Sequence, residues 1–263
     1  MNNTINSRIR IDILNAIQKS GASHIASAFS IVEILISIYN NLNTELVMSK
    51  NPNRDVVILS KGHAGISLYA TLKSYGMMAE KVFETYYKNG SKLSGHISHK
   101  DVAGIEFSTG SLGYGLGVAC GISYAKNLNN NTGKVFCILG DGECNEGSIW
   151  ESALFASHHK LNNLIVIIDH NSLQGTGYTK NIIDQNLTKQ FSSFGWHVVE
   201  LDGHNIESLE NAYKLIGNEK KPLCIVAKTT KGKGVTFMEA NNKYHYKDPQ
   251  GEEYLSAISE LSK

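Results

Sequence analysis

Proline, paired cysteines and long apolar runs are scarce in this sequence. Only 3 of its 263 residues are proline, against 24 glycines, which is typical of a compact folded chain rather than a disordered one. No uninterrupted apolar run exceeds that of residues 164–168, far below the roughly 20 residues that a membrane span needs. The first 20 residues mix charged and apolar side chains without an export-signal pattern. We therefore expect a soluble cytoplasmic protein with no membrane partner.

Cysteine spacing and net charge exclude further classes. The four cysteines, at positions 120, 137, 144 and 224, have neither CxxC spacing nor the density of a disulfide scaffold, so we expect buried thiols and no zinc site. The chain has 25 Lys and Arg against 24 Asp and Glu, a net charge of +1. This balance lacks the basic footprint of a nucleic-acid-binding protein. At about 150 residues per domain, the length allows one large domain or two small ones.

Short apolar runs separated by helical patterns define the expected fold. The runs predict five strands, at 56–59, 135–139, 164–168, 198–201 and 223–227. Helical patterns follow at about 66–73, 148–159 and 206–216. Strands without polar alternation, spaced by helices, indicate an α/β fold with a doubly wound parallel sheet and helices on both faces.

A segment at 112–128 combines a helical pattern with glycines at positions 113, 117 and 121. Each glycine costs a helix about 0.8–1 kcal/mol relative to alanine. Close approach of another backbone or a ligand would offset this cost. We predict a helix whose glycine stripe is a packing surface at a subunit or cofactor interface; a loop is the alternative.

Polar and glycine-rich loops follow three of the predicted strands, at 60–63, 140–142 and 169–171. Ligands of parallel α/β sheets bind beyond the carboxyl ends of the strands. The Asp141 carboxylate suits a divalent cation, and the glycines beside it let phosphate oxygens approach the backbone. A lone Gly-Asp-Gly is usually a turn, but Asn171 in the adjacent loop offers a second oxygen ligand. The Rossmann and P-loop patterns are incomplete.

These loops resemble the thiamine diphosphate motif GDG(x)nN, and the chain as a whole resembles the transketolase family, especially its split form with a separate amino-terminal subunit. The resemblance spans about residues 8–248. It rests on six blocks in order, at 20–25, 59–63, 95–96, 106–113, 140–147 and 231–239, with His245 beyond the last. It implies that one diphosphate-binding domain fills residues 1–263, with a C-terminal helix in 248–263.

The resemblance also implies roles for individual residues. The cofactor would be thiamine diphosphate with Mg²⁺, or another divalent cation such as Ca²⁺ or Mn²⁺. The implied metal ligands are Asp141, Asn171 and the carbonyl of Leu173. The implied cofactor contacts are His63, Gly110, Ser111, Leu112, Gly142, Glu146, Asn171 and His245, with Glu146 belonging to a carboxylate link between two cofactor sites.

The resemblance also implies that three histidines, His24, His96 and His245, face the sugar. Histidine suits this work, because a neutral imidazole can accept a hydroxyl proton near pH 7 and return it. The implied reaction transfers a two-carbon ketol unit from a ketose to an aldose. Histidines outside the blocks are expected to be ordinary surface or loop residues. They are His158, His159, His170, His197 and His204.

The sequence departs from the family pattern beside these histidines. Ser23 and Ala26 stand where the first block usually has glycine, and Ile97 replaces a usual proline. The usual Trp-His-Gly is here Tyr244-His245-Tyr246. The added bulk puts the sugar range in question more than cofactor binding, because the blocks at 59–63 and 140–142 and Asn171 are intact.

Family members use a second domain for the activating Glu and for arginines that bind the sugar phosphate. We therefore expect the chain to be catalytically incomplete alone and to form an α2β2 heterotetramer with a separate carboxyl-terminal subunit. Two other functions stay open: a component of a thiamine diphosphate-dependent 2-oxoacid dehydrogenase or decarboxylase, and a non-catalytic cofactor-binding partner. The motifs at 60–63 and 108–113 and the three histidines favour ketol transfer over the dehydrogenase or decarboxylase, because decarboxylation of an acid does not require several histidines facing sugar hydroxyls. The departures near His24 suggest the non-catalytic partner.

Overall fold

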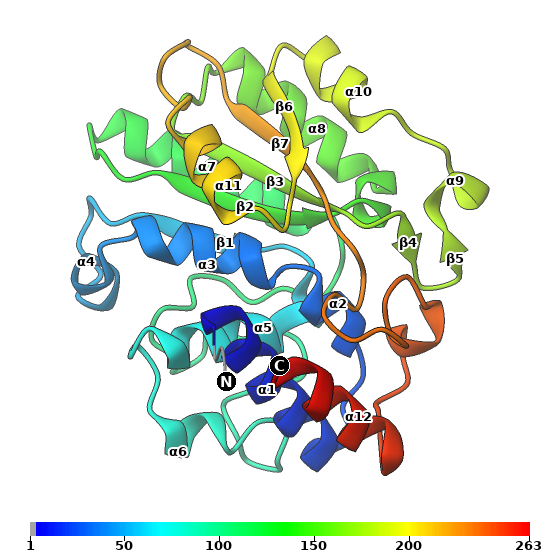
Figure 1. Cartoon of the computed structure of the whole chain (residues 1–263). Helices are drawn as coiled ribbons and strands as arrows, with labels where there is room; N and C mark the ends of the chain where they lie inside the picture. Colours follow the sequence, from blue (N-terminus) through cyan, green and yellow to red (C-terminus); the bar gives the residue numbers. More distant parts are fainter. Residues whose placement is uncertain (1–3) are drawn as a thin grey trace.

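A five-stranded parallel sheet forms the centre of the molecule in the computed structural model, which describes residues 4–263 (Figure 1). The strand order is β1-β2-β3-β7-β6. The strands are β1 (Val56–Leu59), β2 (Val135–Gly140), β3 (Leu164–His170), β6 (His197–Asp202) and β7 (Leu223–Lys228). All five predicted strands are confirmed, with ends that move by a residue or two, the usual uncertainty of element boundaries.

Helices cover both faces of this sheet, and side chains alternate along each strand between two cores. Val57, Phe136 and Ile165 face a core formed with α1 (Ile5–Ser20), α3 (Val32–Asn41), α5 (Gly65–Ser74) and α11 (Ile206–Tyr213). Their neighbours Val56 and Val135 face the opposite core, formed with α7 (Tyr114–Leu128), α8 (Gly147–His158) and α10 (Leu187–Ser193). Strands buried on both sides explain the uninterrupted apolar runs. The predicted doubly wound architecture is confirmed.

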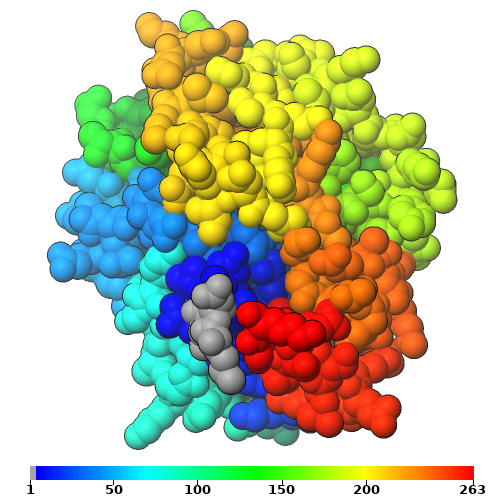
Figure 2. Space-filling view, viewed as in Figure 1, coloured from blue at the N-terminus to red at the C-terminus, as the bar shows by residue number. Residues whose placement is uncertain are grey.

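Shorter elements connect this framework. The remaining helices are α2 (Ile25–Phe29), α4 (Thr44–Met48), α6 (Glu80–Phe83), α9 (Thr179–Ile182) and α12 (Glu252–Leu261), and the 3-10 turns are η1 (Gly62–Ala64), η2 (Gly142–Asn145) and η3 (Asn242–His245). A small hairpin joins β4 (Leu173–Gln174) to β5 (Gly177–Tyr178). Helix α12 lies within the predicted segment 248–263 and packs on α1, as the red and blue surfaces of Figure 2 show. No helix in residues 4–263 has the length and apolar character needed to cross a membrane.

The glycine-rich helix differs from its prediction at one end. Helix α7 begins at Tyr114, because Gly113 has a φ of +90°, in the left-handed region, and lies outside the helix. The tightest approach is at Gly115, where a Cβ would lie 2.4 Å from Cβ of Ser60. At Gly121 a Cβ would meet nothing within 4 Å in the described chain outside its own helix. The predicted role of the stripe at a subunit or cofactor interface therefore stays a prediction, since Gly121 lies open at the surface of this chain.

The carboxyl ends of β1, β2, β3 and β7 meet at one edge of the sheet, because these strands are neighbours and run parallel. Each strand continues directly into a loop at that edge. The loops begin at Ser60, Asp141, Asn171 and Thr229. Chain segments that are far apart in the sequence are thus brought to one place, where the site is expected.

Candidate functional site

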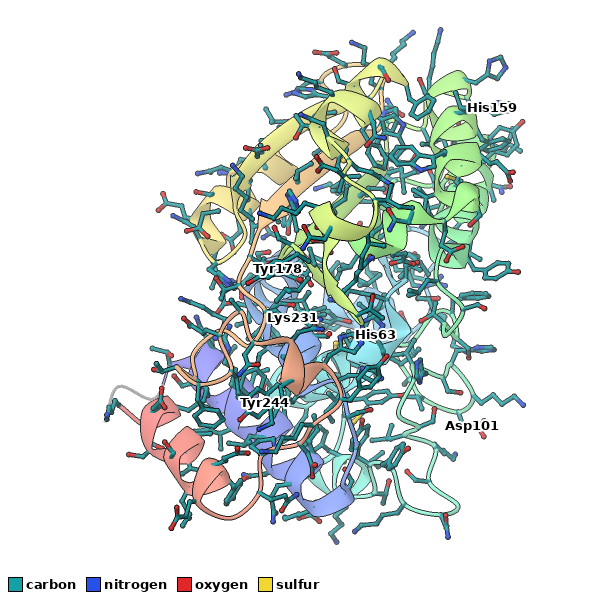
Figure 3. The ribbon with its side chains drawn as sticks, turned by 90° about the vertical axis from the view of Figure 1, so that its right-hand side faces the viewer. His63, Asp101, His159, Tyr178, Lys231 and Tyr244 are labelled. Carbon is teal, nitrogen blue, oxygen red and sulfur yellow. The ribbon has the colours of Figure 1, made fainter. Side chains whose placement is uncertain are left out.

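A pocket of about 370 Å³ lies at this edge of the sheet. Most of the predicted site residues line it. They are His24, His63, His96, Gly110, Leu112, Asp141, Gly142, Asn171, Leu173 and His245. Ser111 and Glu146 are outside the lining: both are exposed, and Glu146 immediately precedes α8. Figure 3 shows His63 and Lys231 facing the middle of the molecule, with His159 and Asp101 far from it.

Imidazole rings gather at one end of the pocket. The His24 ring centroid lies 5.1 Å from that of His63, 6.0 Å from that of His96 and 5.0 Å from that of His245. His24 has a φ of +73°, which is uncommon for a residue other than glycine. Its backbone N–H donates to the carbonyl of His245 (3.0 Å), so the strained backbone joins the two histidines. Such local strain often occurs at functional sites.

Burial and neighbouring positive charge keep these imidazoles neutral. Burial lowers the pKa of His24 to about 4, helped by His96 and the ammonium groups of Lys231 and Lys61. Burial and Lys231 lower the pKa of His245 to about 3. The pKa of His63 falls well below its ordinary value for the same reasons. At neutral pH these rings can therefore accept a proton from a bound hydroxyl group.

Two buried lysines provide positive charge to the pocket, and sequence reasoning did not assign either to the site. Lys61 forms an ion pair with Asp169, and the ammonium of Lys231 lies 2.7 Å from Nδ1 of His245. Lys61 and Lys231 are 2% and 1% exposed. Burial lowers the pKa of Lys231 to about 8. Both lysines stand in blocks of the family pattern, at 59–63 and 231–239, and that position was the available signal.

Asp169 anchors the first lysine. Burial opposes ionisation of this fully buried carboxyl, but Lys61 and hydrogen bonds from Thr229 and Ser30 outweigh it and lower the pKa. The Asn171 side-chain amide also donates to Asp169 (3.0 Å). The loops after β1, β3 and β7 are thereby joined at one carboxylate.

The predicted metal ligands Asp141, Asn171 and Leu173 all line the same pocket. The Asp141 carboxylate accepts hydrogen bonds from the backbone N–H groups of Gly142 (2.7 Å) and Ser172 (2.6 Å). Burial and the nearby Asp169 raise the pKa of Asp141 to about 7. The positive charge near Asp141 is therefore too small to offset the cost of ionising this buried carboxyl. The Leu173 carbonyl is 3.5 Å from the ammonium of Lys231. An acid in this state is suited to a bound cation.

Glu143 holds the loops of the pocket in place. Its carboxylate accepts from the Ser60 hydroxyl and from the backbone N–H groups of Gly113 (2.8 Å) and Gly140 (3.0 Å). It is 2% exposed, and burial raises its pKa in spite of these bonds. One side chain thus connects the ends of β1 and β2 to the start of α7. Sequence reasoning had assigned no role to Glu143.

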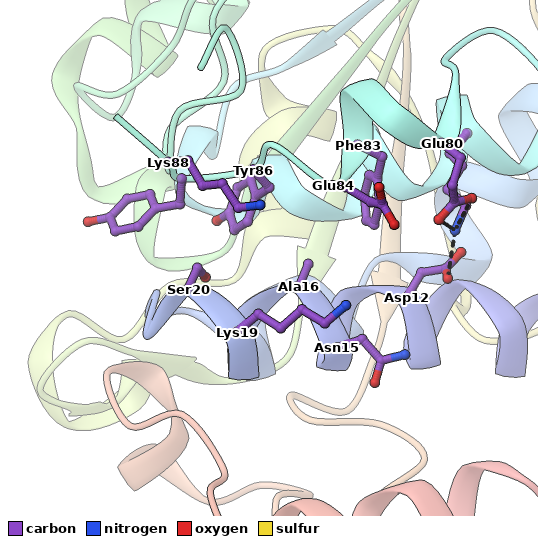
Figure 4. Close-up of a pocket in the computed structure, with 12 residues that line it drawn as sticks. Asp12, Asn15, Ala16, Lys19, Ser20, Glu80, Phe83, Glu84, Tyr86 and Lys88 are labelled. Carbon is purple, nitrogen blue, oxygen red and sulfur yellow. Dashed lines mark hydrogen bonds and ion pairs between the residues drawn. The ribbon is translucent and has the colours of Figure 1, made fainter. Parts of the chain in front are cut away.

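A second hollow, of about 460 Å³, lies where α1 faces α6 and the end of α5 (Figure 4). One of the three lysines that line it is paired within the hollow: the Lys73 ammonium lies 2.9 Å from Asp12 and 2.8 Å from Glu80. None of the predicted site residues lines it. The chemistry of the sequence motifs therefore belongs to the pocket at the sheet edge.

His204 lies in the loop between β6 and α11, as expected, but it also bonds a buried carboxylate, which was not expected. Its Nδ1 lies 2.9 Å from the buried Glu33 carboxylate, and its Nε2 accepts from the backbone N–H of Thr230 (2.8 Å). Arg10 donates to both oxygens of the same carboxylate, at 2.7 Å each. The partners of His204 are distant in the sequence, so no local pattern indicates them.

The whole chain matches a known family. Residues 1–259 match the model described as transketolase, thiamine diphosphate binding domain. The chain is 41% identical to an apulose-4-phosphate transketolase subunit of Actinobacillus succinogenes, covering 97% of this chain and 92% of that protein. It is 36% identical to a 6-deoxy-6-sulfo-D-fructose transketolase subunit of a Clostridium species, covering 97% and 94%.

Complete transketolases match over part of their length. The human enzyme is 38% identical over 91% of this chain but only 38% of its own length. The solved transketolase of Campylobacter jejuni superposes with a TM-score of 0.86 at 29% identity, covering 100% of this chain and 43% of that one. These matches confirm the resemblance predicted from the six sequence blocks. The chain belongs to the transketolase family and carries its thiamine diphosphate-binding domain.

Proposed function

We propose that the pocket holds the diphosphate of thiamine diphosphate together with a divalent cation, Mg²⁺ or another such as Ca²⁺ or Mn²⁺. The residues fit this group: Lys61 and Lys231 are buried cations, and Asp141 has a raised pKa in the same pocket. Residues 4–263 contain no cluster of three His, Cys, Asp or Glu side chains suited to a metal. Asp141 would therefore share the cation with the Asn171 amide, the Leu173 carbonyl and the diphosphate itself.

His63, Gly110, Leu112 and Gly142 are proposed to lie along the cofactor, because all four line this pocket. Ser111, exposed and next to Leu112, is proposed to approach the cofactor from the rim. The cofactor, when bound, supplies the carbanion chemistry that makes and breaks a carbon–carbon bond next to a carbonyl. The protein's own task is to orient the sugar and to manage its protons.

The reaction supported best is transfer of a two-carbon ketol unit from a ketose to an aldose. One observation carries it: the His24, His96 and His245 side chains converge on the pocket that contains the diphosphate-binding groups. A carbon–carbon cleavage beside a hydroxyl needs a base for the hydroxyl proton, and neutral His24 and His245 can accept and return one. Nδ1 of His24 is buried without a hydrogen-bond partner in residues 4–263, which leaves an unsatisfied polar atom in a residue that lines the pocket.

A separate carboxyl-terminal subunit is proposed to complete the site in an α2β2 assembly. The similar proteins of Actinobacillus and Phocaeicola are named as single subunits of a transketolase, which implies that each has a second subunit. The partner would supply the activating Glu and the groups that bind a sugar phosphate. Tyr114, Leu154 and Phe155 are exposed apolar side chains on α7 and α8. This face is proposed for self-association, with Glu146 near it as the predicted link between two cofactor sites.

Two further predictions are part of this proposal. The whole chain, 1–263, is proposed to form one domain, because its two cores share a single sheet. The cytoplasmic location also stays a prediction. Neither the dehydrogenase or decarboxylase alternative nor the non-catalytic partner explains the three imidazoles as directly.

Ketol transfer by the chain alone and with its co-expressed partner tests the proposed function. We expect turnover of a ketose phosphate and an aldose phosphate only when both subunits and thiamine diphosphate are present. Turnover by the isolated chain would contradict the two-subunit claim. A complex that binds the cofactor but transfers no ketol unit would support one of the two alternatives.

A further inference from the structure

Tyr246 occupies a position where the family pattern usually has glycine, directly after the site histidine His245. In the structure its side chain lines the proposed cofactor and sugar pocket. The ring centroid lies 4.6 Å from that of His245, edge to face, and 5.6 Å from that of His24. An aromatic ring thus stands against two of the three histidines that are proposed to handle the sugar.

The backbone around Tyr246 fixes where this ring can lie. Tyr246 follows η3 directly, and the Asn242 side chain in η3 donates to the carbonyl of Gly175 (3.1 Å). A Cβ at Gly175 would lie only 3.1 Å from the Tyr246 hydroxyl oxygen, so the phenol reaches across to the loop after β4. The ring therefore forms a wall between η3 and the β4–β5 hairpin, at the histidine end of the pocket.

The Tyr246 side chain is nevertheless 65% exposed. Within residues 4–263 its hydroxyl forms no hydrogen bond with another group of the protein, so it remains available to a ligand. An apolar ring with a free hydroxyl is suited to a sugar, because the ring packs on C–H groups and the hydroxyl bonds an oxygen. Both features belong to a side chain that lines the same pocket as His24 and His245.

We propose that Tyr246 is a specificity-determining residue, which contacts the sugar carbon chain beside His24 and His245 and narrows the range of ketoses accepted. This inference rests on the proposed ketol transfer. The Tyr246 ring would exclude sugars whose carbon chain does not fit beside it. The Tyr246 hydroxyl would favour sugars that place an oxygen within hydrogen-bonding distance. Glycine at this position would leave the same histidines beside a wider pocket.

Kinetics of the reconstituted two-subunit enzyme test this role. The donors are xylulose-5-phosphate, fructose-6-phosphate and the branched apulose-4-phosphate, each with a fixed aldose acceptor. The deciding quantity is the ratio of kcat/KM values between donors. In Tyr246→Gly we expect at least one such ratio to change fivefold or more, with thiamine diphosphate affinity within twofold of wild type. Ratios that all stay within twofold of wild type would overturn the proposal.

Two further variants separate the contribution of the Tyr246 hydroxyl from that of its ring. Tyr246→Phe keeps the ring and removes one hydrogen bond, so we expect KM for the preferred donor to rise about 3- to 10-fold with kcat unchanged. Tyr254→Phe is the matched control, because that hydroxyl bonds Asn15 between α12 and α1, outside the pocket. If Tyr246→Gly fails to fold or to bind cofactor, the test rests on Tyr246→Phe. A KM of Tyr246→Phe for the preferred donor equal to that of wild type would then overturn the proposal.

Sugar binding distinguishes this inference from the proposed function. If the wild-type complex transfers no ketol unit from any of the three donors, ketol transfer is contradicted, and calorimetry of the same sugars with the cofactor-loaded complex decides on Tyr246. Binding that weakens at least threefold in Tyr246→Gly supports a sugar contact. Equal binding in both proteins, or no binding in either, overturns it.

Discussion

At the scale of single residues, the site depends on side chains whose protonation is set by their surroundings. His24 combines a left-handed backbone with a pKa lowered to about 4, chiefly by burial. Its neighbour His245 is held beside the Lys231 ammonium. Neutral imidazoles next to buried cations are consistent with a site that accepts hydroxyl protons while it holds an anion.

His24→Ala tests the catalytic role of this imidazole. We expect kcat of the two-subunit enzyme to fall by about 10²-fold, the lower end of what a general base contributes. Thiamine diphosphate affinity should stay within about twofold, because the groups proposed to hold the diphosphate and its cation are Asp141 and the two lysines. His197→Ala, at the amino-terminal end of β6 and outside the pocket, is the control. Equal loss of turnover and cofactor affinity would identify His24 as structural.

At the scale of elements, close packing of loops against α7 shapes the pocket. The Gly115 backbone N–H donates to the Ser60 hydroxyl (3.2 Å), which in turn donates to Glu143. A Cβ at Gly115 would lie 2.7 Å from the Cα of Ser60, too close for either backbone to remain in place. Because Gly115 has no side chain, the start of α7 can pack directly against the end of β1.

Gly115→Ala and Gly121→Ala form a matched pair within α7. Gly115→Ala should lower the free energy of unfolding by roughly 1–3 kcal/mol, the usual cost of overpacking. Gly121→Ala should raise it by up to about 1 kcal/mol, because the new methyl group meets open space and alanine favours the helix. Urea denaturation of the two purified variants measures both values. Changes of the same sign and size would contradict the packing described for α7.

The elements also show what the sequence can and cannot predict. The five strands were predictable because strands buried on both faces are uninterrupted apolar runs. Asp141, Gly142 and Asn171 were predictable because their loops follow those strands directly, whereas the family resemblance was needed for His24, His96, Gly110, Leu112 and His245. The left-handed φ of Gly113 was missed, since i, i+4 spacing alone does not reveal where a helix begins. The four helices before Val56 and the β4–β5 hairpin were not predicted.

Other residues were missed because their environment is created by distant parts of the chain. A loop lysine such as Lys231 is usually exposed, and its burial against His245 and Leu173 arises only when η3 and β4 fold over it. His204 is a similar case, because its partners Glu33 and Thr230 come from α3 and from the loop after β7.

At the scale of the whole molecule, a buried ionic network joins α1, α3 and the loops after β6 and β7. Arg10 and His204 both bond Glu33, and His204 also holds Thr230, next to Lys231. Burial disfavours the Glu33 carboxylate, but His204 and Arg10 outweigh this and lower its pKa to about 2. The network connects the stability of the fold to the position of a loop that lines the pocket.

The lowered Glu33 pKa predicts how stability depends on pH. The unfolded chain binds a proton at Glu33 more readily than the folded one, so this contribution is present at pH 7 and is lost as the pH falls from about 4.5 toward 2. The difference in free energy of unfolding between wild type and Glu33→Gln should be roughly 2 kcal/mol smaller at pH 3 than at pH 7. Glu219→Gln, at an exposed site, is the control for urea denaturation at each pH. A gap independent of pH would contradict the network.

The most direct test of the central claim is a calorimetric titration of thiamine diphosphate into the two-subunit complex, with and without Mg²⁺. In wild type we expect Mg²⁺ to strengthen cofactor binding. Asp141→Ala should abolish that dependence and weaken binding at least tenfold, because Asp141 is the only carboxylate proposed to ligate the cation. Unchanged cofactor affinity in Asp141→Ala, with the same response to Mg²⁺, would contradict the assignment of this pocket.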